Sequence, residues 1–168
     1  PRARAFAALA ATLSGRPYSV VRHQRAALTR AVARELADAR RPPFDVVVAE
    51  QLQAFAQSTP AVSAGIPRLL RAQNVESDLW RQLGKASRGV ARTLLLRESA
   101  RLASAERGAL AAAAATIALS ATDGERLRAL APELARIEVL PPPFPGRLDA
   151  AEQHFAQLGC FAGNAGGL

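Results

Sequence analysis

Polar side chains of several chemical kinds follow a short apolar run near the middle of the chain. The run contains Leu69 and Leu70, and the polar residues after it are Arg71, Gln73, Asn74, Glu76, Ser77 and Asp78. An amide side chain both donates and accepts hydrogen bonds but does not titrate, so Gln73 can position a ligand without exchanging a proton with it. The pattern indicates a ligand-positioning site or, equally, a polar loop without chemistry.

A strand followed directly by a helix is expected to hold these side chains. Pro67 precedes the apolar run, which is typical of a buried strand, and Asn74 is a favourable helix N-cap. Glu76 and Asp78 would then lie in the first helical turn, where the helix dipole favours negative charge. In open α/β sheets ligands bind at the carboxyl ends of the strands, which is where this corner would lie.

The elements on either side alternate between helix and strand. Residues 44–49 form a run centred on three valines, which predicts a parallel strand covered on both faces and ending at Glu50. Helical spacing predicts a helix from Ser19 to about Arg40, and further strands are expected at residues 114–119 and 136–140. This rhythm predicts an α/β fold built on a partial, Rossmann-like, doubly wound parallel sheet.

Two further polar residues stand out on the predicted helices. A long helix is expected over residues 88–113, after a loop at residues 84–87, and Glu106 falls in the middle of its apolar face. Such a carboxylate is rarely buried without a partner, so it either braces the polar loop or is salt-bridged at the surface. Ser120 and Asp123 form a capping-box pattern for the next helix. Ser120 is therefore interpreted as a cap.

The composition is that of a globular protein with a basic surface. The 168 residues suffice for one domain with a core, and 22 Lys+Arg against 14 Asp+Glu give a formal net charge of +8. The arginines are dispersed over helices rather than clustered with aromatic residues, which argues against nucleic acid and leaves anionic lipid headgroups as a charged partner. Solvated helix faces are the simpler explanation for most of them. The single cysteine, Cys160, allows no internal disulfide, and His23 and His154 have no metal-ligand spacing.

Residues 71–80, Arg-Ala-Gln-Asn-Val-Glu-Ser-Asp-Leu-Trp, resemble the R-x-H-N-x-E-S-x-x-W segment of bacterial family 4 glycosyltransferases. These are retaining enzymes with two Rossmann-like domains (the GT-B fold) that build polysaccharides. Most of the chain can be laid along the second half of the family's N-terminal, acceptor-side domain. The supporting segments are residues 15–18, 44–50, 119–123 and 139–143 and the long helix with Glu98 and Glu106. This chain has Gln73 where the family usually has a histidine that is thought to contact the sugar.

The resemblance implies a function and a set of site residues. The parent enzyme would transfer a sugar from a nucleotide-sugar donor, with retention, to a polysaccharide or lipid-linked acceptor, with no cofactor and no metal. Residues 1–143 would be a partial acceptor-side domain and residues 144–168 a linker and the truncated start of the donor-nucleotide domain, so the segment would be inactive alone. Gln73 would take the catalytic position, and the substrate-binding residues would be Arg71, Asn74, Glu76, Glu50 and Ser120. Gly163 and Asn164, in a glycine-rich turn, would approach the donor phosphate.

The resemblance also implies a cytoplasmic enzyme with peripheral contact to the inner membrane. Because the chain begins at Pro1 without a basic and apolar leader, it is expected to be a piece of a longer protein. Unpaired strand edges would then promote self-association of the piece. Two other functions stay open. A noncatalytic α/β binding or scaffold domain is suggested by Gln73 in place of histidine, and a basic nucleic-acid or anionic-surface binder rests on charge alone.

Overall fold

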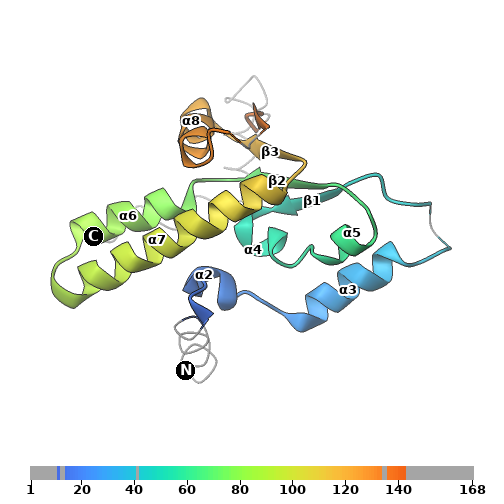
Figure 1. The fold of residues 1–168 in the computed structure, drawn as a ribbon, viewed down its shortest axis with the longest axis horizontal. Coiled ribbons are helices and arrows are strands. Elements are labelled where there is room, and N and C mark those ends of the chain that lie inside the picture. Colours follow the sequence, from blue (N-terminus) through green and yellow to red (C-terminus); the bar gives the residue numbers. More distant parts are fainter. Residues whose placement is uncertain (1–10, 12–13, 41, 134–135, 143–168) are drawn as a thin grey trace, which may run out of the picture.

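The structure is a computed structural model that describes residues 11, 14–40, 42–133 and 136–142. These residues form an α/β fold around a four-stranded sheet. The strands are β1 (Val47–Glu50), β2 (Arg68–Ala72), β3 (Ala115–Ala118) and β4 (Ile137–Val139). Neighbouring strands are all parallel and lie in the order β1-β2-β3-β4 (Figure 1). The predicted α/β fold with a partial, Rossmann-like parallel sheet is confirmed.

Helices connect each strand to the next. The connection from β1 to β2 contains α4 (Gln51–Phe55) and α5 (Pro60–Ser63), and the connection from β2 to β3 contains α6 (Glu76–Ala86) and α7 (Gly89–Ala112). The helix α8 (Ala121–Leu130) leads from β3 to β4, while α2 (Tyr18–Val21) and α3 (Ala26–Leu36) precede the sheet. Because crossovers between parallel strands are right-handed, successive connections in one direction bring their helices to the same face of a sheet.

Two clusters of buried side chains join the strands to these helices. In the first cluster β1 and β2 pack against α4 and α7, and in the second β2, β3 and β4 pack against α7 and α8. Their central members are Ala49, Leu70, Leu102, Ala72, Leu110, Ala118 and Leu127. The helix α7 contributes to both clusters, so it ties the two halves of the sheet together.

The two faces of the sheet differ in burial. The strand residues of both clusters belong to one face, whereas Val48, Leu69 and Ile117 alternate with them and belong to the other. Val48 is half exposed, and Leu69 and Ile117 are partly exposed. The prediction that the first strand is covered on both faces is therefore wrong, because the helices of both clusters pack on the opposite face.

The predicted helix from Ser19 to about Arg40 is interrupted. The helix α2 ends at Val21 and α3 begins at Ala26, and the backbone N–H of Arg25 between them donates to Gln57 Oε1 at 2.8 Å. A side-chain acceptor from the α4–α5 connection thus takes a donor that a continuous helix would have used internally. The helix α3 then packs chiefly against α5.

The helices α6 and α7 form a long hairpin that projects away from the sheet (Figure 1). The helix predicted over residues 88–113 is confirmed as α7, but the loop predicted at residues 84–87 is wrong because α6 continues to Ala86. Gly84 lies within α6 and is buried against α7, where a Cβ atom would come within 2.8 Å of Leu96 Cδ2. Glycine therefore permits the close approach of the two helices.

The predicted linker and truncated second domain, with Gly163 and Asn164, lie outside the described residues. Within the described ranges, no helix is both long enough and apolar enough to cross a membrane.

Candidate functional site

The carboxyl ends of β1 and β2 bring three of the predicted site residues together, Glu50, Arg71 and Gln73. Glu50 ends β1 and lies in register with Arg71 of β2. Arg71 Nη1 contacts Glu50 Oε1 at 2.9 Å, and Gln73 Nε2 donates to Glu50 Oε2 at 3.4 Å. Adjacent parallel strands end at the same edge of a sheet, so residues far apart in sequence share one carboxylate there.

A second amide completes this network. Gln51 Nε2 donates to Gln73 Oε1 at 2.7 Å, so both amide atoms of Gln73 are hydrogen-bonded. Gln51 has a φ of 69°, in the left-handed region that costs a non-glycine residue roughly 1–2 kcal/mol. This conformation lets the chain turn from β1 into α4 without a loop. The strain therefore lies in the same residue that orients Gln73.

The first turn of α6 borders the network. Gln53 Nε2, from α4, donates to Glu76 Oε1 at 3.2 Å. Glu76 and Asp78 both lie in the first turn, as predicted. Asn74 is not the N-cap, because Val75 occupies that position and no side chain of the preceding loop caps the helix. Asn74 is instead exposed beside Gln73.

Glu106 of α7 accepts a backbone N–H group from the first turn of α6. Its side chain is only 4% exposed, and its Oε1 accepts the backbone N–H of Ser77 at 3.3 Å. The Oγ of Ser99, which precedes Glu106 on α7, donates to the Ser77 carbonyl at 2.8 Å. A carboxylate at a helix N-terminus satisfies a free N–H and interacts favourably with the helix dipole. Of the two expected roles, bracing the polar loop is the one the contacts show, and no salt bridge of Glu106 occurs among the described residues.

Glu106 also forms part of the floor of the site. A narrow pocket beside the network has a volume of about 10 Å³, which is room for about one water molecule. Its lining is half polar and half apolar and consists of Gln51, Gln73, Asn74, Glu76 and Glu106 together with Leu52, Leu70, Ala72, Leu110 and Leu127. Glu106 Oε2 is buried and has no hydrogen-bond partner within the described part of the chain. A ligand larger than water therefore has to lie over the exposed rim of the site, above Glu106.

Burial raises the pKa of the Glu106 carboxyl above its usual value of 4.5. Hydrogen bonds from Ser77 and from the backbone of Glu76 act in the opposite direction, and repulsion by the Glu76 carboxylate adds to the rise. Desolvation penalises the charged form, whereas the N–H donors favour it. Glu106 is thus a buried carboxyl group that lies close to the carboxylate of Glu76.

Ser120 takes the capping role that the sequence pattern predicted for it. Its Oγ accepts the backbone N–H of Asp123 at 3.1 Å and donates to Asp123 Oδ2 at 2.7 Å, so it is the N-cap of α8. The helix begins at Ala121, two residues earlier than predicted. Neither hydrogen bond connects Ser120 to the network around Glu50.

Sequence reasoning missed Gln51 and Gln53, whereas the bracing of the polar loop by Glu106 was one of its two expectations. Gln51 directly follows the predicted strand end at Glu50, so its position was the available signal. The signal for Glu106 was a carboxylate in the middle of an apolar helix face. No group of three or more His, Cys, Asp or Glu side chains in the described segments is placed to hold a metal ion.

The edge of the sheet thus presents two amides, a guanidinium and carboxylates over a narrow pocket, a donor and acceptor set suited to ligand hydroxyl groups. No protein-family model, curated protein or solved structure matches this chain. Its function is therefore inferred from its residues and their geometry.

Proposed function

We propose that this chain forms the acceptor-side wall of a retaining glycosyltransferase, and that the carboxyl edge of β1 and β2 binds sugar hydroxyl groups. The single observation that carries this proposal is the network of Glu50, Arg71, Gln73 and Gln51. Three of these four residues, Glu50, Arg71 and Gln73, are among those for which the resemblance of residues 44–50 and 71–80 implies a sugar site. Their convergence supports the proposal because the two segments are separated by two helices.

The chemistry of the network suits a neutral polyol. Each hydroxyl of a sugar needs one donor and one acceptor, and Gln73 provides both, with Glu50 as a charged acceptor and Arg71 as a charged donor. The network is partly exposed at its rim, so a hydroxyl can replace the weaker contact from Gln73 to Glu50, which is 3.4 Å long. Gln73 acts as a positioning group in this scheme, since an amide does not titrate.

In a glycosyl transfer this wall would orient the acceptor. Holding the acceptor hydroxyl close to the donor carbon lowers the entropic part of the barrier. Stabilising the leaving diphosphate is a separate electrostatic task, which the resemblance assigns to a donor-nucleotide domain. The proposed substrates are accordingly a nucleotide-sugar donor and a glycan or lipid-linked acceptor, with a cytoplasmic location.

A noncatalytic α/β binding or scaffold domain is the second candidate. It is favoured by Gln73, which stands where the resembling family has an imidazole and whose amide is already hydrogen-bonded to Gln51 and Glu50 within the chain. Determining the coding sequence on both sides of this chain separates the candidates. A downstream Rossmann unit with paired glutamates supports the enzyme, and its absence supports the binding domain.

Nuclear magnetic resonance of the ¹⁵N-labelled chain tests sugar binding directly. We expect the side-chain amide signals of Gln51, Gln73 and Asn74 to shift in a saturable way with at least one member of a panel of monosaccharides, disaccharides and nucleotide sugars. The amide of Gln82, which donates to Asp78 Oδ2 at 2.9 Å on α6, is the internal control. The loss of one signal in Gln73→His assigns the residue.

Two results would contradict the proposal. The first is that no member of the panel moves the three amide signals, and the second is that Gln82 moves as much as they do. Incubation of the chain with radiolabelled nucleotide sugars should show no transfer, because the resemblance covers only the acceptor side. Sustained transfer by the chain would show that the assignment to one wall is wrong.

A further inference from the structure

A second pocket lies at the opposite end of β2 from the network of Glu50, Arg71 and Gln73. Arg68 is the first residue of β2, and its burial alternates along the strand with that of Leu70, so it belongs to the face of the sheet that carries the helices. The pocket is lined by Arg68 and by residues of the segment before α2, of α2, of the connection from β1 to β2 and of α7. Its volume of about 440 Å³ is within the range of pockets that bind small organic ligands.

Arg68 is a buried cation without a carboxylate partner among the described residues. It is only 8% exposed, and no ion pair in the described part of the chain includes it. Its Nη1 contacts the Phe55 carbonyl and Ser58 Oγ, both at 3.5 Å, which is longer than the usual N–H···O hydrogen bond. Its Nε and Nη2 have no acceptor in the described segments, so most N–H donors of this guanidinium are unused.

The ring of Phe55 supports this guanidinium. The Arg68 Cζ atom lies over the ring, 4.2 Å from its centroid, and Phe55 itself is buried in the first apolar cluster. Burial lowers the pKa of the Arg68 guanidinium below its usual value, because desolvation penalises the charged form. Buried charges in proteins are normally paired, so an anion bound in the pocket would supply the partner that Arg68 lacks.

The rest of the pocket suits a singly charged anion with an apolar body. No Asp or Glu of the described chain lines it, so no carboxylate of the lining repels an anion. A second cation of the lining, Arg16, is exposed, and its Nη1 already donates to Gln24 Oε1 at 3.1 Å. Arg68 is therefore the buried charge of the pocket. The lining is otherwise mainly apolar, with Val20, Leu52, Phe55, Ala56, Ala105 and Ala109.

We propose that this pocket binds a small organic carboxylate, with the carboxylate on Arg68 and the apolar body against Val20 and Leu52. The planar guanidinium fork matches a carboxylate through two parallel N–H···O bonds. A carboxylate carries one negative charge, which one arginine neutralises. A phosphate monoester carries about −1.5 to −2 at pH 7 and would keep unpaired charge in an apolar pocket.

This site goes beyond the proposed glycosyl transfer and does not depend on it. None of the residues that line the pocket belongs to the network at the carboxyl end of β2. Loss of sugar binding would leave the carboxylate site intact, and loss of carboxylate binding would leave the sugar site intact.

Nuclear magnetic resonance titration of the whole ¹⁵N-labelled chain tests the proposal. The probes are phenylacetate and hexanoate, with phenylacetamide as the neutral control and phenyl phosphate as the more highly charged one. We expect at least one carboxylate to shift the Arg68 Nε–H signal saturably, without shifting the side-chain amide of Gln73. Phenylacetamide should bind at least about tenfold more weakly than phenylacetate, because it lacks the charge-assisted hydrogen bonds. The signal that disappears in Arg68→Lys assigns the Arg68 Nε–H.

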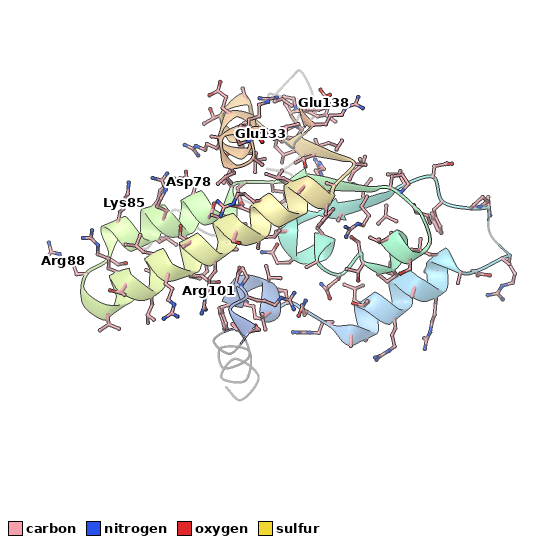
Figure 2. The ribbon with its side chains drawn as sticks, viewed as in Figure 1. Asp78, Lys85, Arg88, Arg101, Glu133 and Glu138 are labelled. Atoms are coloured by element: carbon pink, nitrogen blue, oxygen red, sulfur yellow. The ribbon has the colours of Figure 1, made fainter. Side chains whose placement is uncertain are left out.

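Variants of Arg68 locate the charge that binds the probe. Arg68→Met keeps a long side chain over Phe55 but removes the charge, and should raise the Kd of phenylacetate by at least about tenfold. Arg68→Lys keeps the charge without the fork and should raise the Kd by several-fold. The matched control is Arg88→Met, which removes the same charge from an exposed residue that Figure 2 shows at the far end of the α6–α7 hairpin. Its Kd should stay within about twofold of the wild type, because distant charges are screened.

Three results would overturn the proposal. They are the absence of binding by both carboxylates, equal binding of phenylacetate and phenylacetamide, and an equal loss in Arg88→Met and Arg68→Met. The first two comparisons use the wild type, so they decide the matter even if Arg68→Met does not fold. Tighter binding of phenyl phosphate than of phenylacetate would assign the pocket to phosphate esters and would contradict the choice of a carboxylate.

Discussion

The inner and outer halves of α7 both carry apolar and basic residues but lie in opposite environments. The inner half (residues 98–112) and the outer half (residues 89–97) both contain leucine and arginine. In the inner half Leu102 and Leu110 are buried against the sheet, whereas in the outer half Val90 and Leu94 are exposed. An apolar helix face is buried only where another element covers it, and the sheet ends before the outer half begins. The presence of leucine therefore does not distinguish a core segment from a surface segment here.

The polar residues of the two halves differ in the same way. In the inner half Glu98, Ser99 and Glu106 are buried, and each is hydrogen-bonded to the backbone of another element. In the outer half Arg92 and Arg97 are exposed. A buried polar group has to find a partner, so the inner half fixes the positions of α2 and α6, while the exposed arginines of the outer half can hydrogen-bond to water.

The largest difference between the halves should appear on truncation of a leucine. Leu102→Ala removes a fully buried side chain and should lower the free energy of unfolding by about 2–5 kcal/mol. Leu94→Ala, in the outer half, should change it by less than about 0.5 kcal/mol. Urea denaturation followed by circular dichroism measures both. Equal losses would mean that the outer half is buried in solution.

The second largest difference concerns two glycines. In Gly84→Ala the new methyl group meets Leu96 and should cost about 1–3 kcal/mol by overpacking, from which the helix preference of alanine recovers about 1 kcal/mol. Gly108→Ala, where nothing lies within 4 Å of the new Cβ, should stabilise the protein by up to about 1 kcal/mol. Thermal melts of the two variants compare them. Stabilisation by both would show that α6 and α7 are less closely packed than the Gly84 contact implies.

A smaller difference is expected for two serines. Ser99→Ala removes the buried hydrogen bond to the Ser77 carbonyl and should cost about 0.5–1.5 kcal/mol. Ser87 Oγ donates to the Leu83 carbonyl at 2.8 Å near the outer end of the hairpin, but water can replace that exposed bond. We therefore expect Ser87→Ala to cost less than Ser99→Ala in the same denaturation assay. A larger cost for Ser87→Ala than for Ser99→Ala would mean that the hydrogen bond at the outer end of the hairpin stabilises the protein more than the buried one.

The smallest effect is a pH dependence from Glu106. Its pKa is raised in the folded protein, so the folded state binds more protons than the unfolded chain between pH 4.5 and the folded pKa. Stability therefore falls as pH rises through that range. Glu106→Gln stays neutral and should lack this slope, so the variant should gain stability relative to the wild type as pH rises from below 4.5. The hydrogen bonds from Ser77 and Glu76 offset part of the effect of burial, which keeps the difference small.

Urea denaturation at a series of pH values measures this difference. Asp78, whose pKa Arg81 lowers, contributes a slope of the opposite sign, but it does so in both proteins and cancels in the comparison. A constant difference between Glu106→Gln and the wild type across the series would show that Glu106 is not desolvated in the folded state.

The sequence by itself determined the elements whose signals are local. The apolar run at Leu69 and Leu70 is β2, the periodic stretch ending near residue 113 is α7, and the Ser120–Asp123 pattern is a helix cap. Each of these rests on interactions between residues no more than about four positions apart, which a linear pattern records. The alternation of strands and helices likewise sufficed for the α/β fold class.

Only the tertiary structure decided which polar groups meet. Asn74 was the local choice for the cap of α6, but Glu106, 29 residues from Ser77, accepts the N–H instead. Gln51 and Gln73, separated by 22 positions, meet because β1 and β2 are adjacent. The exposure of Val48 and Leu94 was decided in the same way, by which surfaces the helices cover. A linear pattern indicates which hydrogen bonds or apolar contacts a residue is able to make. The partner that the residue contacts depends on strand order and helix packing, which are set by the whole chain.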